Sequence, residues 1–192
     1  SSLAAARAPL VARMDGDDIM QPERLQRQYS FLLENPNIAL LGPRARLVPN
    51  ELLQDGFREY IRWQNACLSS DDIADEIYVE LPIAHPSVMF RRDTVLSLGG
   101  YRDGDFPEDY EMLLRLHQHG QQMAKLPEVL LHWRDSDGRL TRTDERYTSD
   151  AFDRVRYYYL AAGSCVQRGG TLGFWGGAGV VGTPRAQATA PA

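Results

Sequence analysis

Cysteine is scarce in this chain, which has two among its 192 residues. Cys67 and Cys165 lie far apart and match no metal-binding spacing, so the sequence predicts two free thiols. Nothing in this cysteine usage points to an oxidising compartment, where closely spaced pairs form disulfide frameworks.

Long apolar runs and an excess of basic charge are also missing. No stretch approaches the roughly 20 apolar residues of a membrane-spanning helix, and no signal peptide is visible, so we expect a cytoplasmic protein without a transmembrane segment. The 26 acidic residues outnumber the 21 Lys and Arg, and the net charge of -5 argues against a general nucleic-acid binder. With 43% hydrophobic and 24% charged residues, the composition is that of one ordinary globular domain with a sizeable core.

Acidic residues are concentrated in one short stretch near the beginning of the sequence. Apolar residues 9–12 lead towards Asp15, Asp17 and Asp18, with Gly16 among them. Carboxylates this close repel one another and would raise each other's pKa, so a fold usually keeps them where a cation neutralises them. Hard oxygen ligands favour Mg²⁺ or Mn²⁺, and Mg²⁺ is typically held by one or two carboxylates plus substrate phosphates. The stretch therefore predicts a divalent metal at the end of a strand, next to a phosphorylated ligand.

The acidic stretch has two other possible interpretations besides a metal site. A solvated turn is a common setting for acidic residues with Gly, and this alternative stays open. A calcium-binding EF-hand loop is excluded, because counting from Asp15 its sixth position is Met20 instead of Gly and its twelfth is Gln26 instead of Glu.

The clearest helix pattern runs from Glu108 to His119 and ends at Gly120. Glu108 and Asp109 fall in its first turn, where the helix dipole favours negative charge. Acidic residues at a helix start are common for this reason alone, so a purely structural role is the alternative to a chemical one.

Several motifs together resemble those of family 2 glycosyltransferases. The sequence MDGDDIMQPERL at 14–25 resembles that family's metal and nucleotide-sugar motif, and PEDYEMLLRL at 107–116 resembles the acidic segment that carries its catalytic base. Between them, HPSVMFRR at 85–92 and the Gly-Gly-Tyr of 99–101 look like the family's strand, helix and acceptor-side loop. The resemblance covers roughly residues 1 to 160 and is specific because the motifs keep their order and spacing.

This resemblance implies a GT-A fold, here its C-terminal portion, an α/β mixed sheet flanked by helices. It implies transfer of a sugar from a nucleoside diphosphate sugar to a glycan, lipid-linked or other hydroxyl acceptor, with inversion and with Mg²⁺ or Mn²⁺. It assigns Asp17 to the metal and diphosphate, Asp15 to the metal or ribose, and Asp18 to support of the donor site. It assigns Asp109 to the general base and Glu108 to acceptor contact.

Two histidines and one arginine are further candidates for the site. His85 could face the acceptor or the donor and is assigned to acceptor binding, with a hydrogen-bonded structural role as the alternative. His132 is a candidate metal ligand, but in the register that matches Arg134 to the family's Arg, the family's His position is Ser136. A third protein ligand for the metal therefore stays open. Arg134 is expected to contact the diphosphate, with a solvated loop arginine as the alternative.

Short strand and helix patterns are mixed along the chain, which indicates an α/β domain. Gly42, Pro43, Pro49 and Gly56 predict irregular chain over 42–56. The other segments are expected to be strands at 10–14, 38–41, 87–91 and 129–133, and helices at 22–34, 57–68, 70–78, 93–98, 108–119 and 144–162.

Both ends of the chain carry expectations about domain organisation. We expect a partial GT-A domain at 1–162, because the family normally has a long nucleotide-binding half before the acidic motif, and a catalytically inactive fragment is the alternative to an enzyme. Residues 163–192 are predicted to be a Gly-, Ala- and Pro-rich tail, or the truncated start of a second domain. The tail spells G-x-G-x-x-G at 177–182, but Pro184 follows and no acidic residue comes after it, so a Rossmann-type nucleotide-binding module is the weaker alternative.

Overall fold

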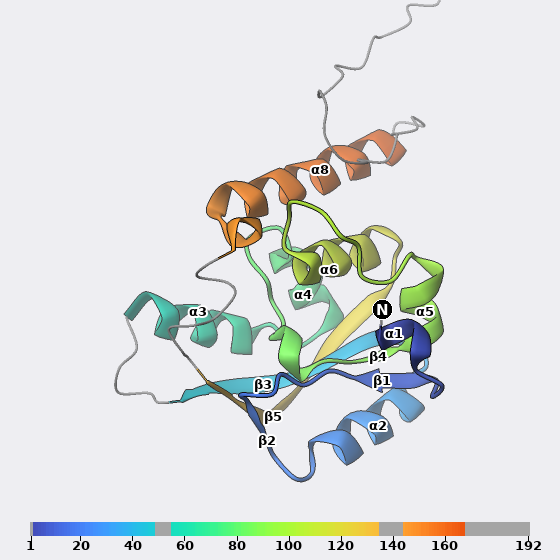
Figure 1. Cartoon of the computed structure of the whole chain (residues 1–192), viewed down its shortest axis with the longest axis vertical. Coiled ribbons are helices and arrows are strands. Elements are labelled where there is room, and N and C mark those ends of the chain that lie inside the picture. Colours follow the sequence, from blue (N-terminus) through green and yellow to red (C-terminus); the bar gives the residue numbers. More distant parts are fainter. Residues whose placement is uncertain (1, 49–54, 135–143, 168–192) are drawn as a thin grey trace, which may run out of the picture.

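The structure is a computed structural model that describes residues 2–48, 55–134 and 144–167. Its centre is a five-stranded mixed sheet in the order β1-β4-β3-β5-β2, with helices on both faces (Figure 1). The strands are β1 (Leu10–Ala12), β2 (Ile19–Met20), β3 (Ile38–Val48), β4 (Met89–Arg91) and β5 (Gln122–Arg134). The helices are α1 (Ser2–Ala5), α2 (Arg24–Glu34), α3 (Asp55–Ala66), α4 (Ser70–Glu76), α5 (Arg92–Ser97), α6 (Glu108–Gln118) and α8 (Ser149–Gln167), with short 3₁₀ segments η1 (His85–Ser87) and η2 (Glu145–Tyr147). The predicted α/β class is confirmed.

The helices form layers on the two faces of the sheet. Figure 1 shows α2 on one face, α3, α4 and α6 on the other, and α8 packed over α6. Successive side chains of β3 point to opposite faces of the sheet. Leu40 belongs to the core under α4 and α6, and Leu41 belongs to the core under α2. No helix in the described ranges is long and apolar enough to cross a membrane.

The long parallel pair β3–β5 corrects one sequence prediction. The sequence predicts a strand only at 38–41 and irregular chain over 42–56. In the structure, β3 continues to Val48 alongside β5. The ladder accommodates Pro43 through register shifts on either side of Arg44. Gly42 is needed there, because a Cβ would lie 2.5 Å from Ile83 Cγ2. The side chain of Asn65 then fixes the strand by bonding both the N–H and the C=O of Ala45, at 3.0 and 2.8 Å.

Helix α2 is confirmed, but its inward face is more polar than its apolar periodicity suggests. Leu25, Tyr29 and Leu33 are exposed, while Arg24 and Gln28 are buried. Gln28 Nε2 donates to the carbonyl oxygens of Leu41 and Ser87 at 2.8 and 2.9 Å, which satisfies backbone acceptors of two separate segments. The polar face of α2 therefore connects the helix to β3 and to η1 through hydrogen bonds.

The acidic stretch crosses the sheet from one edge to the other. Strand β1 corrects the prediction of a buried strand over 10–14, because it has only three residues, of which Leu10 and Val11 are half-buried and Ala12 is exposed. It pairs antiparallel with β4 and forms one edge of the sheet. Strand β2 pairs with β5 and forms the opposite edge. The segment 13–18 connects them, so it must run across the end of the central strands. This path places its carboxylates over the end of the sheet.

The two cysteines and the C-terminal segment are described only in part. Cys67 is a buried free thiol, as predicted, and the side chain of Cys165 lies outside the described residues. Helix α8 runs past residue 162 to Gln167. The glycine motif at 177–182 and the rest of the predicted tail beyond residue 167 lie outside the described residues.

A buried ion pair on α6 joins three elements of the fold. Arg115 Nη2 donates to Glu111 Oε2 at 2.8 Å and to the carbonyl oxygen of Gly100 at 2.6 Å. Glu111 Oε1 also accepts from Tyr159 Oη of α8 at 2.5 Å. Because both charged side chains are almost fully buried, each depends on the other for compensation.

We expect Arg115→Met to lower the free energy of unfolding by about 3–5 kcal/mol, because it leaves the buried Glu111 carboxylate with only the more exposed Arg102, at 3.3 Å, as a cationic partner. The matched control is Arg62→Met, which breaks an exposed pair with Glu59 and should cost less than about 1 kcal/mol. Urea unfolding measures both. Equal small losses in the two variants would contradict a structural role for the buried pair.

Candidate functional site

The acidic turn presents two carboxylates towards solvent. Asp18 N donates to the carbonyl oxygen of Asp15 at 3.3 Å, which closes the turn. Asp17 is exposed near its tip, and Asp15 is partly exposed. The Asp15 carboxylate forms an ion pair with Arg13, with Oδ1 3.2 Å from Nη2, so one charge of the turn is balanced from within the same segment.

A buried arginine supports this segment from the sheet side. Arg24 of α2 is 0% exposed, and its guanidinium donates to the Arg13 carbonyl oxygen, to Met14 Sδ at 3.1 Å and to Gln28 Oε1 at 3.1 Å. Burial lowers the pKa of Arg24, and the negative charge of Asp18 acts in the opposite direction. The backbone of the acidic segment is therefore held in place by a side chain that the sequence analysis did not single out.

Asp18 and Arg134 meet, but through the backbone of Arg134. Asp18 Oδ1 accepts from Arg134 N at 2.8 Å, which ties the acidic turn to the end of β5. His132, two residues earlier, accepts at Nε2 from Gln21 Nε2 at 3.0 Å. Both predicted residues at this end of β5 thus lie close to the turn, and His132 Nε2 is already engaged.

The carboxylates of the turn fit a metal ion that shares its coordination with a ligand. In the part of the chain that the structure covers, no group of three or more His, Cys, Asp and Glu side chains could hold a metal. Mg²⁺ is usually bound by only one or two carboxylates plus substrate phosphates, and Asp15 and Asp17 supply that number. The donor set therefore fits Mg²⁺ or Mn²⁺ together with a phosphorylated ligand.

The second acidic pair begins helix α6. Asp109 Oδ1 accepts from Tyr110 N at 2.8 Å. Burial and then the negative charge of Glu108 raise the pKa of Asp109 to about 6, against the Tyr110 N–H and Arg13, which act to lower it. Glu108 Oε2 accepts from Tyr147 Oη of η2 at 2.7 Å. A carboxyl group whose pKa lies near neutrality is suited to proton transfer.

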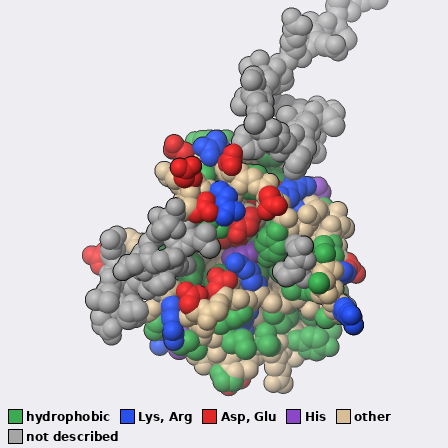
Figure 2. Space-filling model, viewed as in Figure 1, with side chains coloured by type: hydrophobic (Ala, Val, Ile, Leu, Met, Phe, Trp, Pro, Cys, Tyr) green, Lys and Arg blue, Asp and Glu red, His purple; other side chains and the backbone are tan. Residues whose placement is uncertain are grey.

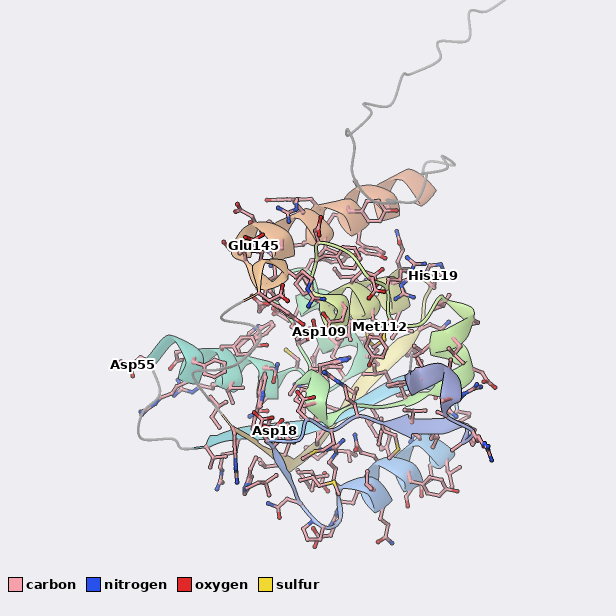
Figure 3. The ribbon with its side chains drawn as sticks, viewed as in Figure 1. Asp18, Asp55, Asp109, Met112, His119 and Glu145 are labelled. Atoms are coloured by element: carbon pink, nitrogen blue, oxygen red, sulfur yellow. The ribbon has the colours of Figure 1, made fainter. Side chains whose placement is uncertain are left out.

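Carboxylates of the acidic turn and of the start of α6 both raise the pKa of the same tyrosine, Tyr101. Burial raises the pKa of Tyr101, and the charges of Asp109, Glu108 and Asp15 raise it as well, whereas Arg13 opposes them. The acidic turn and the start of α6 are far apart in the sequence, yet both lie within electrostatic reach of Tyr101. Figure 3 labels Asp109 at the start of α6, in the helical layer, and Asp18 below it beside the strands.

Arg13 is the cation at the centre of these groups. It is paired with Asp15, and its positive charge also lowers the pKa of Asp109 and of His85. Figure 2 shows charged side chains of both signs mixed across the middle of this face, between the helical layer and the strands. The arrangement joins the acidic turn and a carboxyl group of raised pKa around one arginine.

His85 lies behind Tyr101. It is 2% exposed, and its Nε2 lies 2.9 Å from Tyr101 Oη, with the two rings edge to face. Burial holds the pKa of His85 well below its usual range, and Arg13 lowers it further, so the ring is neutral. His85 is therefore connected to the site through its hydrogen bond with Tyr101. This matches the alternative prediction for His85, a hydrogen-bonded structural role.

Four site residues were missed in the sequence: Arg13, Arg24, Tyr101 and Tyr147. Arg24 and Tyr101 stand inside the motifs quoted above and Arg13 directly precedes one of them, but nothing in their spacing shows that they converge. Tyr147 follows a segment that is outside the described residues, and its contact with Glu108 has no signal in the sequence. Only the Arg24–Gln28 spacing, two polar residues on one helix face, offers a hint.

The chain is similar to bacterial glycosyltransferases in sequence. It is 37% identical over 122 residues to the amylovoran biosynthesis glycosyltransferase AmsE of Erwinia amylovora, covering 64% of this chain and 43% of that protein. It is 32% identical over 127 residues to the O-antigen biosynthesis glycosyltransferase WbnJ of Escherichia coli, covering 65% of this chain and 47% of that protein. The chain thus spans less than half of the length of these relatives. No family model matches it.

Solved structures support the fold. The TarS 1–349 fragment of S. aureus, crystallised with UDP-GlcNAc, superposes with a TM-score of 0.60 at 13% identity, covering 83% of this chain and 44% of that one. A second TarS structure gives a TM-score of 0.53, also at 13% identity, and covers 83% of this chain and 29% of that one. The chain has the GT-A type of α/β fold, as the sequence predicts.

Because the charge of Glu108 raises the pKa of Asp109, we expect Glu108→Gln to lower that pKa from about 6. A carboxyl ¹³C NMR titration of Asp109 measures the change. Glu23→Gln, at an exposed position before α2, is the matched control and should leave the pKa unchanged. An unaltered Asp109 titration in Glu108→Gln would show that the two carboxylates do not interact.

Proposed function

We propose that this chain carries the site of a family 2 glycosyltransferase that moves a sugar from a nucleoside diphosphate sugar to an acceptor hydroxyl, with inversion and with a divalent metal. The observation that carries the proposal is the convergence of the acidic turn and of Asp109 on Arg13 and Tyr101. Sugar transfer needs a binding site for an anionic leaving group and a base for the acceptor hydroxyl. The site offers one group for each task.

The donor side of the proposed site is the acidic turn. Asp15 and Asp17 would hold Mg²⁺ or Mn²⁺, and the ion would neutralise charge on the diphosphate leaving group. Asp18 keeps the turn attached to β5 by accepting from Arg134 N. The Arg134 side chain is exposed beside the turn, which suits the proposed contact with the diphosphate.

The acceptor side of the proposed site is the start of α6. Above a pH of about 6, Asp109 is ionised and accepts the proton of the attacking hydroxyl. Below that pH the carboxyl group is protonated and cannot act as a base. Glu108, fixed by Tyr147, is proposed to contact the acceptor, and His85 contributes through Tyr101.

Inversion follows from the roles proposed for these residues. An acceptor hydroxyl deprotonated by Asp109 attacks the anomeric carbon directly, on the side opposite the diphosphate. The bond to the acceptor oxygen forms as the bond to the diphosphate oxygen breaks, which is one displacement. Holding both reactants in line supplies much of the rate enhancement.

The similar proteins support the choice of substrates. AmsE and WbnJ are named for amylovoran and O-antigen biosynthesis, which supports a glycan or lipid-linked glycan as acceptor. TarS 1–349 is in complex with UDP-GlcNAc, and we extend a nucleoside diphosphate sugar to this chain as part of the proposal.

Calorimetric titration with UDP and with GDP, each with and without Mn²⁺, tests the donor site. We expect Mn²⁺-dependent binding of at least one nucleotide that is lost in Asp17→Asn, because the substitution removes a charged oxygen ligand. Asp75→Asn, at an exposed position on α4, is the matched control and should bind normally. Failure of the folded protein to bind either nucleotide, with or without Mn²⁺, would overturn the proposed function.

A further inference from the structure

The Arg13 guanidinium is used differently from those of three other arginines in the fold. Arg24, Arg91 and Arg115 all donate to backbone carbonyl oxygens and so support the structure. The Arg13 side chain is 34% exposed and makes no hydrogen bond with the residues that the structure describes. It forms an ion pair with Asp15, with Nη2 3.2 Å from Oδ1. The N–H donors of this guanidinium are therefore available to a ligand.

The backbone that carries the Arg13 side chain is held in place. Arg13 N donates to the carbonyl oxygen of Val88 at 2.9 Å, and the Arg13 carbonyl oxygen accepts from the buried Arg24. The side chain thus starts from a fixed point, two residues before Asp15. A long side chain on a fixed backbone can exchange one partner for another by changing its rotamer, without movement of the fold.

The metal ion proposed for the acidic turn would share the Asp15 carboxylate with Arg13. A divalent cation and a guanidinium at one carboxylate repel each other. An ion pair between partly exposed side chains contributes little to stability, so Arg13 can give up Asp15 at small cost. Diphosphate oxygens offer a guanidinium charge-assisted, bidentate hydrogen bonds, which the pair with Asp15 lacks. A metal-bound diphosphate would therefore release Arg13 from Asp15 and supply its next partner.

We propose that Arg13 is a donor-binding residue that pairs with Asp15 in the absence of ligand and with the diphosphate of the nucleotide sugar when the donor is bound. The proposal rests on the proposed function, since the metal and the nucleotide are taken from there. It gives Arg13 opposite effects on two binding steps. The side chain weakens binding of the metal alone, because it competes for Asp15, and it strengthens binding of nucleotide with the metal.

Calorimetric affinity for UDP and GDP in the presence of Mn²⁺ tests the ligand contact. We expect Arg13→Met to weaken binding about 10- to 100-fold, as for the loss of a hydrogen bond to a charged group. Arg13→Lys keeps the charge but not the fork of N–H donors, so its affinity should lie between the two. Inorganic pyrophosphate with Mn²⁺ should show the same loss in Arg13→Met, because it shares only the diphosphate with the nucleotides. Arg27→Met breaks another partly exposed ion pair, with Glu128, and is the matched control that should bind normally.

Binding of Mn²⁺ without nucleotide, followed by the EPR signal of the free ion, tests the exchange of partners. We expect Arg13→Met to bind Mn²⁺ about 2- to 5-fold more tightly, because the positive charge that competes for Asp15 is gone. A purely structural role of Arg13 in the turn would instead weaken both binding steps. Thermal unfolding followed by circular dichroism confirms that each variant is folded.

The outcomes separate this inference from the proposed function. Unchanged nucleotide affinity in Arg13→Met, or weaker binding of Mn²⁺ alone, would overturn the role of Arg13 and leave the proposed function intact. Absence of nucleotide binding by the unaltered protein would overturn the proposed function and this inference together.

Discussion

The hydrogen bonds of the buried Arg24 fix the path on which the site depends. The segment from β1 to β2 must cross the end of the sheet, because its two strands lie at opposite edges. Arg24 holds the crossing backbone at the carbonyl of Arg13, and Gln28 links the same helix to β3 and to the end of η1. This polar network holds the backbone that leads into the acidic turn.

Charge balance then decides how the site is organised. Three carboxylates, on Asp15, Glu108 and Asp109, act on Tyr101, and Arg13 is the cation that opposes them. Among the charges that act on Tyr101 the carboxylates outnumber the arginine, which suits the divalent metal proposed for this site. The raised pKa of Asp109 has the same origin, since burial and a neighbouring carboxylate both disfavour its charged form. The proposed metal site and the proposed general base therefore draw on one arrangement of charges.

The sequence predicted the parts of this structure that depend on local patterns. The α/β class, the helix that begins at Glu108 and the acidic turn after a strand could all be recognised, because periodicity and turn residues are local signals. The continuation of β3 through Pro43 could not, since it depends on pairing with β5 and on the side chain of Asn65. The same holds for the contact of Asp18 with the backbone of Arg134 and for the position of His85 behind Tyr101. Each of these joins residues distant in sequence, which no spacing encodes.

The measurement that tests the central claim most directly is the release of nucleoside diphosphate from a panel of UDP- and GDP-sugars by the unaltered chain and by Asp109→Asn. The account predicts that Asp109→Asn slows release by about 10²- to 10⁴-fold, the usual contribution of a general base, while nucleotide affinity stays the same. Asp105→Asn, exposed in the loop before α6, should release nucleotide at the normal rate. Release by Asp109→Asn as fast as by the unaltered chain would contradict the account, because the start of α6 would then have no part in the chemistry.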